Sequence, residues 1–194
     1  MDKQAALEAI KTRIQTELSC PLKDAATHLV FGKGNCEAEL MLIGEAPGAR
    51  EDLEGIPFVG AAGKELDKLL HSIGLSLNDA YIANILKYRP PGNRDPQPDE
   101  IRRHTPFLIE QIRIIAPRVI ATLGNFSTRF LLAGCKVDAM HTIKGITTLH
   151  GKPQDLILSD LHLTIIPLYH PAAMLYNPHC AQSSHTTSSA SANT

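Results

Sequence analysis

Residues 39–63 read ELMLIGEAPGAREDLEGIPFVGAAG, and this stretch decides the fold class. A short apolar run at 40–43 breaks at once into a turn rich in glycine and proline at 44–48. Such a run is typical of a buried parallel strand, because helices cover both faces of a parallel sheet. Open α/β sheets bind ligands at the carboxyl ends of their strands. We therefore predict that Glu45 and Phe58 lie at the mouth of a ligand pocket.

Strand-like and helix-like segments alternate along the rest of the chain. Further apolar runs predict strands at residues 81–86, 118–123 and 161–169. Apolar residues recur at helical spacing at residues 3–18, 63–73, 99–116 and 126–133. This alternation predicts an α/β protein with a parallel sheet.

Weaker signals add detail to this outline. Gly74 is placed to end the second helix, and Asn125 is a candidate N-cap of the last one. We also expect a short strand around residues 29–32 and a stiff, non-helical loop at 87–96. Residues near 143–149 predict either a hairpin or an irregular excursion.

The bulk composition suits one domain. The chain has 194 residues, 43% of them hydrophobic, and a formal net charge of -1. We predict a single domain over residues 1–176 and a low-complexity, disordered tail over 177–194. Apolar runs are too short for a membrane helix, and the N-terminus predicts an amphipathic helix rather than a signal peptide. We expect a monomeric, cytoplasmic protein, associated with the nucleoid if the source is prokaryotic.

The candidate functional residues cluster at the predicted strand ends. They are Gly44, Glu45, Asn84, Lys87 and His170. Each has a structural alternative: Asn84 as a buried amide that pairs with loop backbone, Glu45 as an ion-pair partner of Arg50 or Lys87, and His170 as a strand cap. Phe58 could be ordinary core. Because these positions share one edge of one sheet, we favour a common site.

The side chains suggest what such a site could hold. An asparagine amide can pair with an imide edge, which offers an N–H and a C=O. Phe58 offers a stacking face. A neutral histidine can donate to a carbonyl oxygen that gains negative charge, and a glutamate can steady a developing cation or orient a water. A pyrimidine that leaves a sugar as an anion would use all four groups.

Four segments, in this order, resemble family 4 of the uracil-DNA glycosylase superfamily. They are GEAPGAREDLEGIPFVGAAG at 44–63, YIANILKYRPPGNRDP at 81–96, PFLIEQIRIIAPRVIATLG at 106–124 and YHPAAML at 169–175. The resemblance implies a three-layer α/β/α fold around a four-stranded parallel sheet. It also implies a DNA repair enzyme that flips uracil out of DNA and hydrolyses its N-glycosidic bond.

The resemblance also assigns roles to individual residues. Glu45 and His170 match the catalytic residues, and His170 would stabilise the uracil anion at O2. Gly44, Phe58 and Asn84 match the uracil-binding positions, with Phe58 stacking on the base and Asn84 reading it. Met174 and Leu175 match the segment that wedges into the duplex. Lys87, Arg89 and Arg94 are predicted phosphate contacts, the alternative being a solvated loop.

The chain departs from the family at its cofactor. Family members typically hold a [4Fe-4S] cluster with four cysteines, and here only Cys20 matches, since the other positions are Glu17, Tyr88, and His104 or a neighbour of it. Clusters need a full thiolate set. We therefore expect no cluster and no other metal, with packing around Glu17, Tyr88 and His104 in its place. The four cysteines of the chain are expected to be scattered reduced thiols.

Three questions stay open at this level. Ala61 replaces an arginine that is common in the family, so the chain could be a non-catalytic relative that binds nucleic acid. It could also be a glycosylase for another deaminated base, such as hypoxanthine or xanthine. Either Glu45 activates the attacking water, or electrostatic stabilisation by Glu45 and His170 is enough for the reaction without an activating group.

Overall fold

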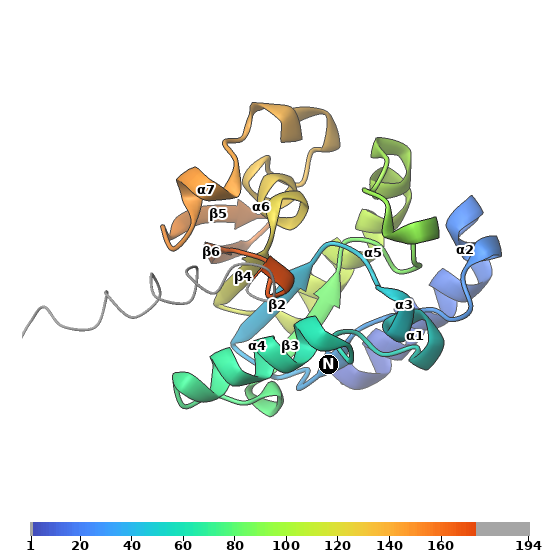
Figure 1. Cartoon of the computed structure of the whole chain (residues 1–194), viewed down its shortest axis with the longest axis horizontal. Coiled ribbons are helices and arrows are strands. Elements are labelled where there is room, and N and C mark those ends of the chain that lie inside the picture. Colours follow the sequence, from blue (N-terminus) through green and yellow to red (C-terminus); the bar gives the residue numbers. More distant parts are fainter. Residues whose placement is uncertain (1, 174–194) are drawn as a thin grey trace, which may run out of the picture.

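The computed structural model describes residues 2–173, and a six-stranded sheet lies at its centre (Figure 1). The strand order is β1-β3-β2-β4-β6-β5. Four strands run parallel in the middle: β2 (Leu40–Gly44), β3 (Ala80–Asn84), β4 (Val119–Leu123) and β6 (Leu161–Leu168). The edge strands, β1 (Lys33–Gly34) and β5 (Gln154–Leu158), are antiparallel to their neighbours. The predicted four-stranded parallel sheet is thus confirmed as the centre of a larger, mixed sheet.

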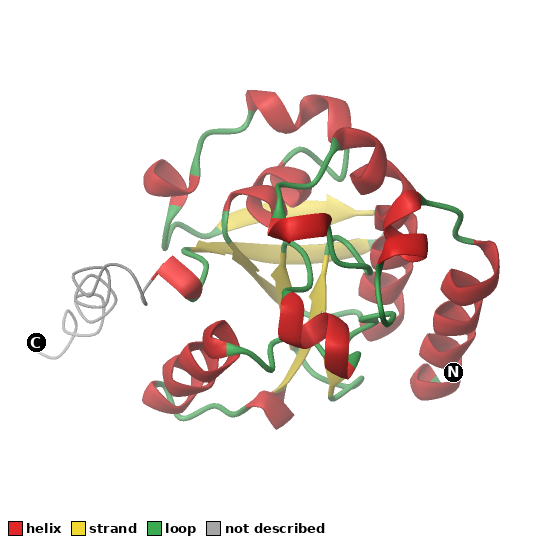
Figure 2. Ribbon diagram, turned by 45° about the vertical axis from the view of Figure 1, so that its right-hand side comes forward, coloured by secondary structure: helices red, strands yellow, loops and turns green. Residues whose placement is uncertain are grey.

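Helices flank the sheet, as Figure 2 shows in red around the yellow strands. The four predicted helices are confirmed within two residues at each end: α1 (Lys3–Glu17), α4 (Ala61–Ser72), α5 (Pro98–Ile115) and α6 (Asn125–Leu132). Three short helices lack a clear periodic signal and were not predicted: α2 (Pro21–Ala25), α3 (Ala49–Glu54) and α7 (Ile146–Leu149). Short 3-10 helices are η1 (Leu77–Asp79), η2 (Pro91–Asn93) and η3 (Val137–Thr142).

Alternate residues of the strands face two separate hydrophobic clusters. Met41 and Ile43 of β2 point into the larger cluster, which contains the apolar faces of α1, α5 and α6. Leu42 points to the opposite face, into a smaller cluster with Leu66 and Leu70 of α4. Because side chains alternate across a strand, β2 is buried on both faces, as its continuous apolar run predicted.

Several local predictions need correction. Residues 29–32 form no strand, because pairing with β3 begins only at Lys33. The hairpin of this part of the chain is β5–β6, and residues 146–149 are helical. Asn125 is the first residue of α6 rather than its N-cap, since its Oδ1 accepts a hydrogen bond from the distant Ile146 N–H at 2.8 Å. Gly74, with φ of 77°, follows α4 as predicted.

Some predictions fall outside residues 2–173. These are the domain end at residue 176, the tail at 177–194 and the wedge residues Met174 and Leu175. Within the described range, no helix has the length and apolar character that crossing a membrane requires.

Candidate active site

A pocket of about 400 Å³ opens at the carboxyl ends of β2, β3 and β6. Its volume lies in the range of small-molecule sites. Four of the residues predicted for the site line it: Glu45, Phe58, Asn84 and His170. The parallel strands bring them together although they are spread over more than 120 positions of the sequence. The structure therefore places the predicted residues in one cavity.

Asn84 is the last residue of β3 and pairs in register with Gly44 at the end of β2. Its side chain is almost fully buried, and Oδ1 has no hydrogen-bond partner among residues 2–173. A buried, unpaired amide oxygen costs about 1–3 kcal/mol. A Cβ on Gly44 would lie 2.4 Å from Oδ1 and 2.8 Å from the Phe58 ring, so only glycine fits there. The structural alternative, in which Asn84 pairs with loop backbone, does not hold for Oδ1.

Phe58 is held in a strained backbone conformation. Its φ is 52°, in the left-handed region that aromatic residues rarely adopt. The carboxylate of Glu51 on α3 accepts hydrogen bonds from the N–H groups of Val59 and Gly60 at 2.9 and 2.8 Å. On the other side, a Cβ at Gly63 would lie 2.0 Å from the Phe58 carbonyl oxygen. These contacts fix the ring as one wall of the pocket.

His170 follows β6 and lies opposite Phe58. The two rings are nearly parallel, with centroids 6.0 Å apart and an interplanar angle of 29°. The N–H of Ala172 donates to Nδ1 at 3.2 Å, so the neutral ring carries its hydrogen on Nε2. Burial lowers the pKa of His170, although the charge of Glu51 opposes the shift. His170 is therefore a neutral donor at neutral pH.

Glu45 is a half-buried carboxylate directly after β2. Burial raises the pKa of Glu45 to about 7, and the negative charge of Asp95 adds to the shift. The structural alternative, an ion pair with Arg50 or Lys87, does not form, because Arg50 pairs with Glu54 at 2.9 Å and Lys87 contacts other groups. A carboxyl group with a pKa near the working pH suits acid–base or electrostatic chemistry.

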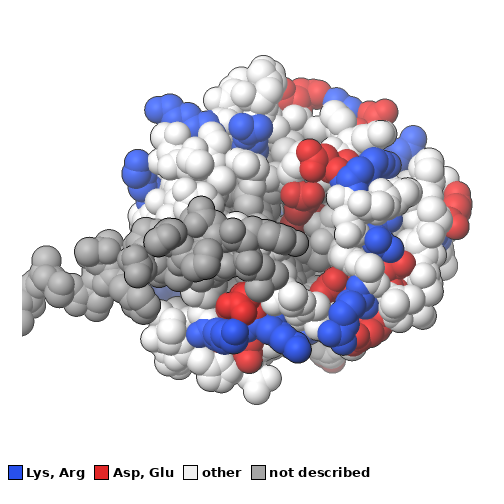
Figure 3. Space-filling view, viewed as in Figure 1, with Lys and Arg blue, Asp and Glu red and all other residues white. Residues whose placement is uncertain are grey.

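The prediction that Lys87 contacts phosphate is wrong, because its side chain is fully buried. Its ammonium donates to backbone and amide oxygens inside the protein. Arg94 lines the pocket mouth, but both of its terminal nitrogens bond to the carboxylate of Glu100, at 2.9 and 2.5 Å. Arg89 donates to Asn93 at 2.7 Å. On the face in Figure 3, basic and acidic side chains of the described residues are interspersed.

A second buried polar group, formed by His104, Cys20 and Tyr88, contacts the backbone of Lys87. The N–H of Lys87 donates to Nδ1 of His104 at 2.8 Å, so Nε2 of that ring carries the hydrogen and points at the sulfur of Cys20, 3.1 Å away. The rings of Tyr88 and His104 are nearly perpendicular, with an interplanar angle of 82° and centroids 6.1 Å apart. Burial, and then the charge of Lys87, lower the pKa of His104 to about 4. Every polar atom of this ring is paired.

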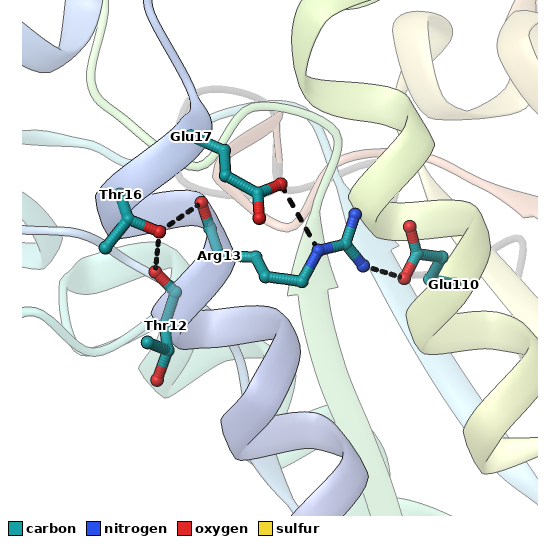
Figure 4. Close-up of polar contacts among 5 residues, drawn as sticks. All are labelled: Thr12, Arg13, Thr16, Glu17 and Glu110. Carbon is teal, nitrogen blue, oxygen red and sulfur yellow. Dashed lines mark hydrogen bonds and ion pairs between the residues drawn. The ribbon is translucent and has the colours of Figure 1, made fainter.

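Glu17 does not join this group, contrary to the prediction. Figure 4 shows its carboxylate bonded to Arg13 on the same helix, and Arg13 also bonds to Glu110 of α5. The Arg13–Glu17 distance is 3.3 Å and the Arg13–Glu110 distance 2.7 Å. Glu17 is thus part of an exposed link between α1 and α5.

The Cys20 region is a poor match to an iron–sulfur cluster. Among the matched ligand positions Cys20 is the one cysteine, and Nε2 of His104 has no free lone pair because it carries the ring hydrogen. In the part of the chain that the structure describes, no three His, Cys, Asp or Glu side chains are grouped as a metal site requires. Cys20, Cys36 and Cys135 are free thiols, as predicted, and Cys180 lies outside the described residues.

Sequence reasoning missed several residues that shape the pocket. Glu51 was missed because the six-residue helix that carries it was not predicted. Gly124, with φ of 95°, packs against the Cβ of His170, where its added Cβ would lie at 3.4 Å. Pro90 and Asn93 line the pocket from the loop that follows β3. The Glu51 carboxylate accepts from N–H groups at the start of α4, eight and nine positions further along the chain, so no pattern within α3 signals it.

Comparison with known proteins agrees with the geometry. The family model of the uracil DNA glycosylase superfamily matches residues 31–189. The type-4 uracil-DNA glycosylase of Sulfurisphaera tokodaii is 42% identical over 89% of this chain and 77% of its own length. The corresponding protein of Archaeoglobus fulgidus is 42% identical over 89% and 85%, and that of Thermotoga maritima 38% over 90% and 86%. The chain therefore belongs to the uracil-DNA glycosylase superfamily, and within it to the type-4 family.

Proposed function

We propose that the protein is a uracil-DNA glycosylase, which binds uracil flipped out of DNA and hydrolyses its N-glycosidic bond to leave an abasic site. The observation that carries the proposal is the unpaired Oδ1 of Asn84, buried in a pocket between Phe58 and His170. An enzyme can reach the glycosidic bond only after the nucleotide leaves the base stack. The family relationship points to the same reaction.

Recognition follows from the donors and acceptors in the pocket. Oδ1 of Asn84 accepts from N3–H of uracil, and the amide N–H donates to O4. Cytosine offers the opposite pattern at both positions, so it would leave the buried Oδ1 facing another acceptor. Phe58 supplies the stacking face. The site is selective because the wrong base would leave a buried polar atom of Asn84 without a hydrogen bond.

Bond cleavage separates charge between base and sugar. The uracil leaves as an anion, and Nε2–H of His170 donates to its O2, where negative charge develops. The sugar becomes oxocarbenium-like, and the Glu45 carboxylate stabilises that cation or orients the attacking water. The ionised form of Glu45 is needed for either role, so its pKa of about 7 limits the rate in acid.

The protein performs this reaction without an iron–sulfur cluster. Support comes from the side chains near Cys20, where His104 already makes two hydrogen bonds and the Tyr88 ring packs against it in a T-shaped arrangement. The buried Cys20–His104–Tyr88 group takes the structural place of a cluster. Iron in stoichiometric amount, or absorbance near 400 nm in the purified protein, would contradict this part of the proposal.

Contacts to the DNA backbone are assigned to Arg89 and Arg94. Both belong to the loop after β3, next to the pocket mouth, and their side chains are partly exposed. Phosphate would compete with Glu100 for Arg94 and with Asn93 for Arg89. The wedge at Met174 and Leu175 remains a prediction, as does a monomeric state. A protein that acts on DNA is expected in the cellular compartment that contains the DNA.

Release of uracil from a defined oligonucleotide tests the proposal. Wild type should release uracil, while Asn84→Ala and His170→Ala should be impaired although folded. Undiminished release by these variants would contradict the assigned roles. Salt-dependent binding without product would instead indicate a non-catalytic relative. A panel with hypoxanthine and xanthine measures the base preference.

A further inference from the structure

Lys87 is a fully buried basic side chain that the proposed chemistry does not use. Its Nζ is surrounded by three oxygens: the Asn84 carbonyl at 2.9 Å, Gln111 Oε1 at 2.6 Å and the Phe31 carbonyl at 3.4 Å. An ammonium has three N–H donors, so this set of acceptors satisfies it. None of these acceptors is a carboxylate, and burial lowers the pKa of Lys87 to about 7. A charge buried without a counterion is costly. The arrangement of oxygens around Lys87 Nζ therefore indicates that this side chain has a function.

The backbone N–H and carbonyl of Lys87 are both hydrogen-bonded. Its N–H donates to Nδ1 of His104 at 2.8 Å, and its carbonyl accepts from Val30 N–H at 2.9 Å. Gln111, which holds the ammonium, also donates to the Phe31 carbonyl at 3.1 Å. The end of the lysine side chain therefore has one position, set by α5 and by the segment that precedes β1.

The hydrogen bond between Lys87 and the Asn84 carbonyl lies at the end of β3. Asn84 is the last residue of the strand, and the next two N–H groups bond to the carbonyls of Gly44 and Glu45. The Asn84 carbonyl and the Ile85 N–H belong to one peptide plane, which is held on one edge by Lys87 and on the other by the Gly44 carbonyl. Because the direction in which a side chain leaves the backbone depends on that plane, the bond from Lys87 contributes to the direction of the Asn84 amide.

We infer that Lys87 is a positioning residue for base recognition, holding the Asn84 carbonyl so that the Asn84 amide meets the imide edge of uracil. The inference rests on the proposed function for the identity of the base. It replaces the predicted phosphate contact with a role inside the protein. Lys87 acts through Asn84 and touches no part of the substrate.

Equilibrium binding of non-cleavable DNA tests this inference apart from catalysis. The probes are two single-stranded oligonucleotides that differ at one nucleotide, 2′-fluoro-2′-deoxyuridine or 2′-fluoro-2′-deoxycytidine, since the fluorine disfavours the cationic sugar. Lys87→Met should weaken binding of the deoxyuridine probe about tenfold and leave the deoxycytidine probe within about twofold. Tyr81→Phe is the matched control, because it removes a hydroxyl that bonds to Gln111 at 3.4 Å without touching Lys87.

A double-mutant cycle separates positioning from a merely structural role. In an Asn84→Ala background, Lys87→Met should change affinity for the deoxyuridine probe less than about twofold, because the residue it positions is gone. If the tenfold loss persists there, or if both probes weaken equally, the inference is wrong. Should Lys87→Met fail to fold, Gln111→Leu carries the same cycle, with an expected loss of about threefold from the removal of one acceptor.

The outcomes for the two proposals are distinct. Wild type that prefers the deoxyuridine probe but releases no uracil from ordinary DNA would contradict the proposed catalysis, and the Lys87 cycle would still decide the positioning role. Wild type that shows no preference between the probes would contradict the inference about Lys87 directly.

Discussion

Two buried polar groups lie on either side of Lys87, and they differ in how fully their atoms are paired. On the pocket side, Asn84 Oδ1 has no partner among residues 2–173, and the half-buried Glu45 carboxyl has a raised pKa. On the other side, both nitrogens of His104 are paired, one with the Lys87 N–H and one with the Cys20 sulfur. Asn84 and His104 are both almost fully buried, so the difference between them lies in the pairing of their polar atoms.

The difference separates a binding site from a structural one. Proteins rarely leave buried polar atoms unpaired, so an exception that faces a cavity indicates a ligand that completes it. A fully paired group has nothing left to offer a ligand and contributes to stability instead. Substitutions on the pocket side should therefore reduce activity, and those on the Cys20 side should reduce stability.

Asn84→Ala should have the largest effect. Loss of both hydrogen bonds to the imide edge is expected to slow uracil release on the order of 10³-fold in single-turnover assays. The free energy of unfolding should stay within about 1 kcal/mol, because Oδ1 has no protein partner to lose. A large loss of stability with little loss of rate would show that Asn84 stabilises the fold rather than binds the base.

His170→Ala should slow release on the order of 10²-fold by removing the donor to uracil O2. His170→Asn, which keeps an N–H donor, should recover part of the rate. Denaturant unfolding serves as the control for folding. Equal defects in the alanine and asparagine variants would contradict the role of His170 as a hydrogen-bond donor.

Glu45 should give the rate a pH dependence. Its pKa is raised to about 7 and the ionised form is active, so the rate should rise about tenfold per pH unit below 7 and level off above it. Glu45→Gln should be slow and lack this rise. A wild-type profile that is flat between pH 5 and 8 would contradict the assignment.

The same carboxyl should affect stability in the opposite sense. A raised pKa means that the folded state holds the proton more tightly, so this contribution is present below pH 4.5 and lost as pH rises to about 7. Glu45→Gln should therefore stabilise the protein at pH 8, by about 1–2 kcal/mol because partial solvent exposure weakens the penalty. Denaturant unfolding at pH 5 and pH 8 measures the difference.

Cys20→Ala should have the smallest effect on activity. It leaves Nε2–H of His104 buried without its sulfur partner, which is expected to cost about 1–2 kcal/mol of unfolding free energy. Uracil release should stay within about threefold of wild type, since Cys20 lies outside the pocket. Loss of release in a well-folded variant would show that the two regions are not separate.

The sequence predicted the parts of the site that depend on local order. Asn84 and His170 were found because parallel strands put their carboxyl ends on one edge, so a polar residue at the end of an apolar run is informative. Glu45 and Phe58 were found from the turn that follows β2. The central strands and the four long helices were predictable for the same reason, since each has its own periodic pattern.

What the sequence could not reveal depends on distant partners. Lys87 follows a strand in a basic loop and was assigned to phosphate, but its acceptors include Phe31 and Gln111, which are 56 and 24 positions away. Asn125 was assigned to capping, while its side chain bonds to Ile146 instead. The edge strands were missed because β1 has two residues and β5 is half exposed, so neither forms an apolar run.

The most direct test of the account is a time course of base release from a single-stranded oligonucleotide that contains one deoxyuridine, with the same oligonucleotide carrying deoxycytidine as the control. The account predicts that wild-type protein free of iron releases uracil, leaves an abasic site and spares the deoxycytidine strand. Folded protein that releases no uracil, or that releases both bases equally, would contradict it.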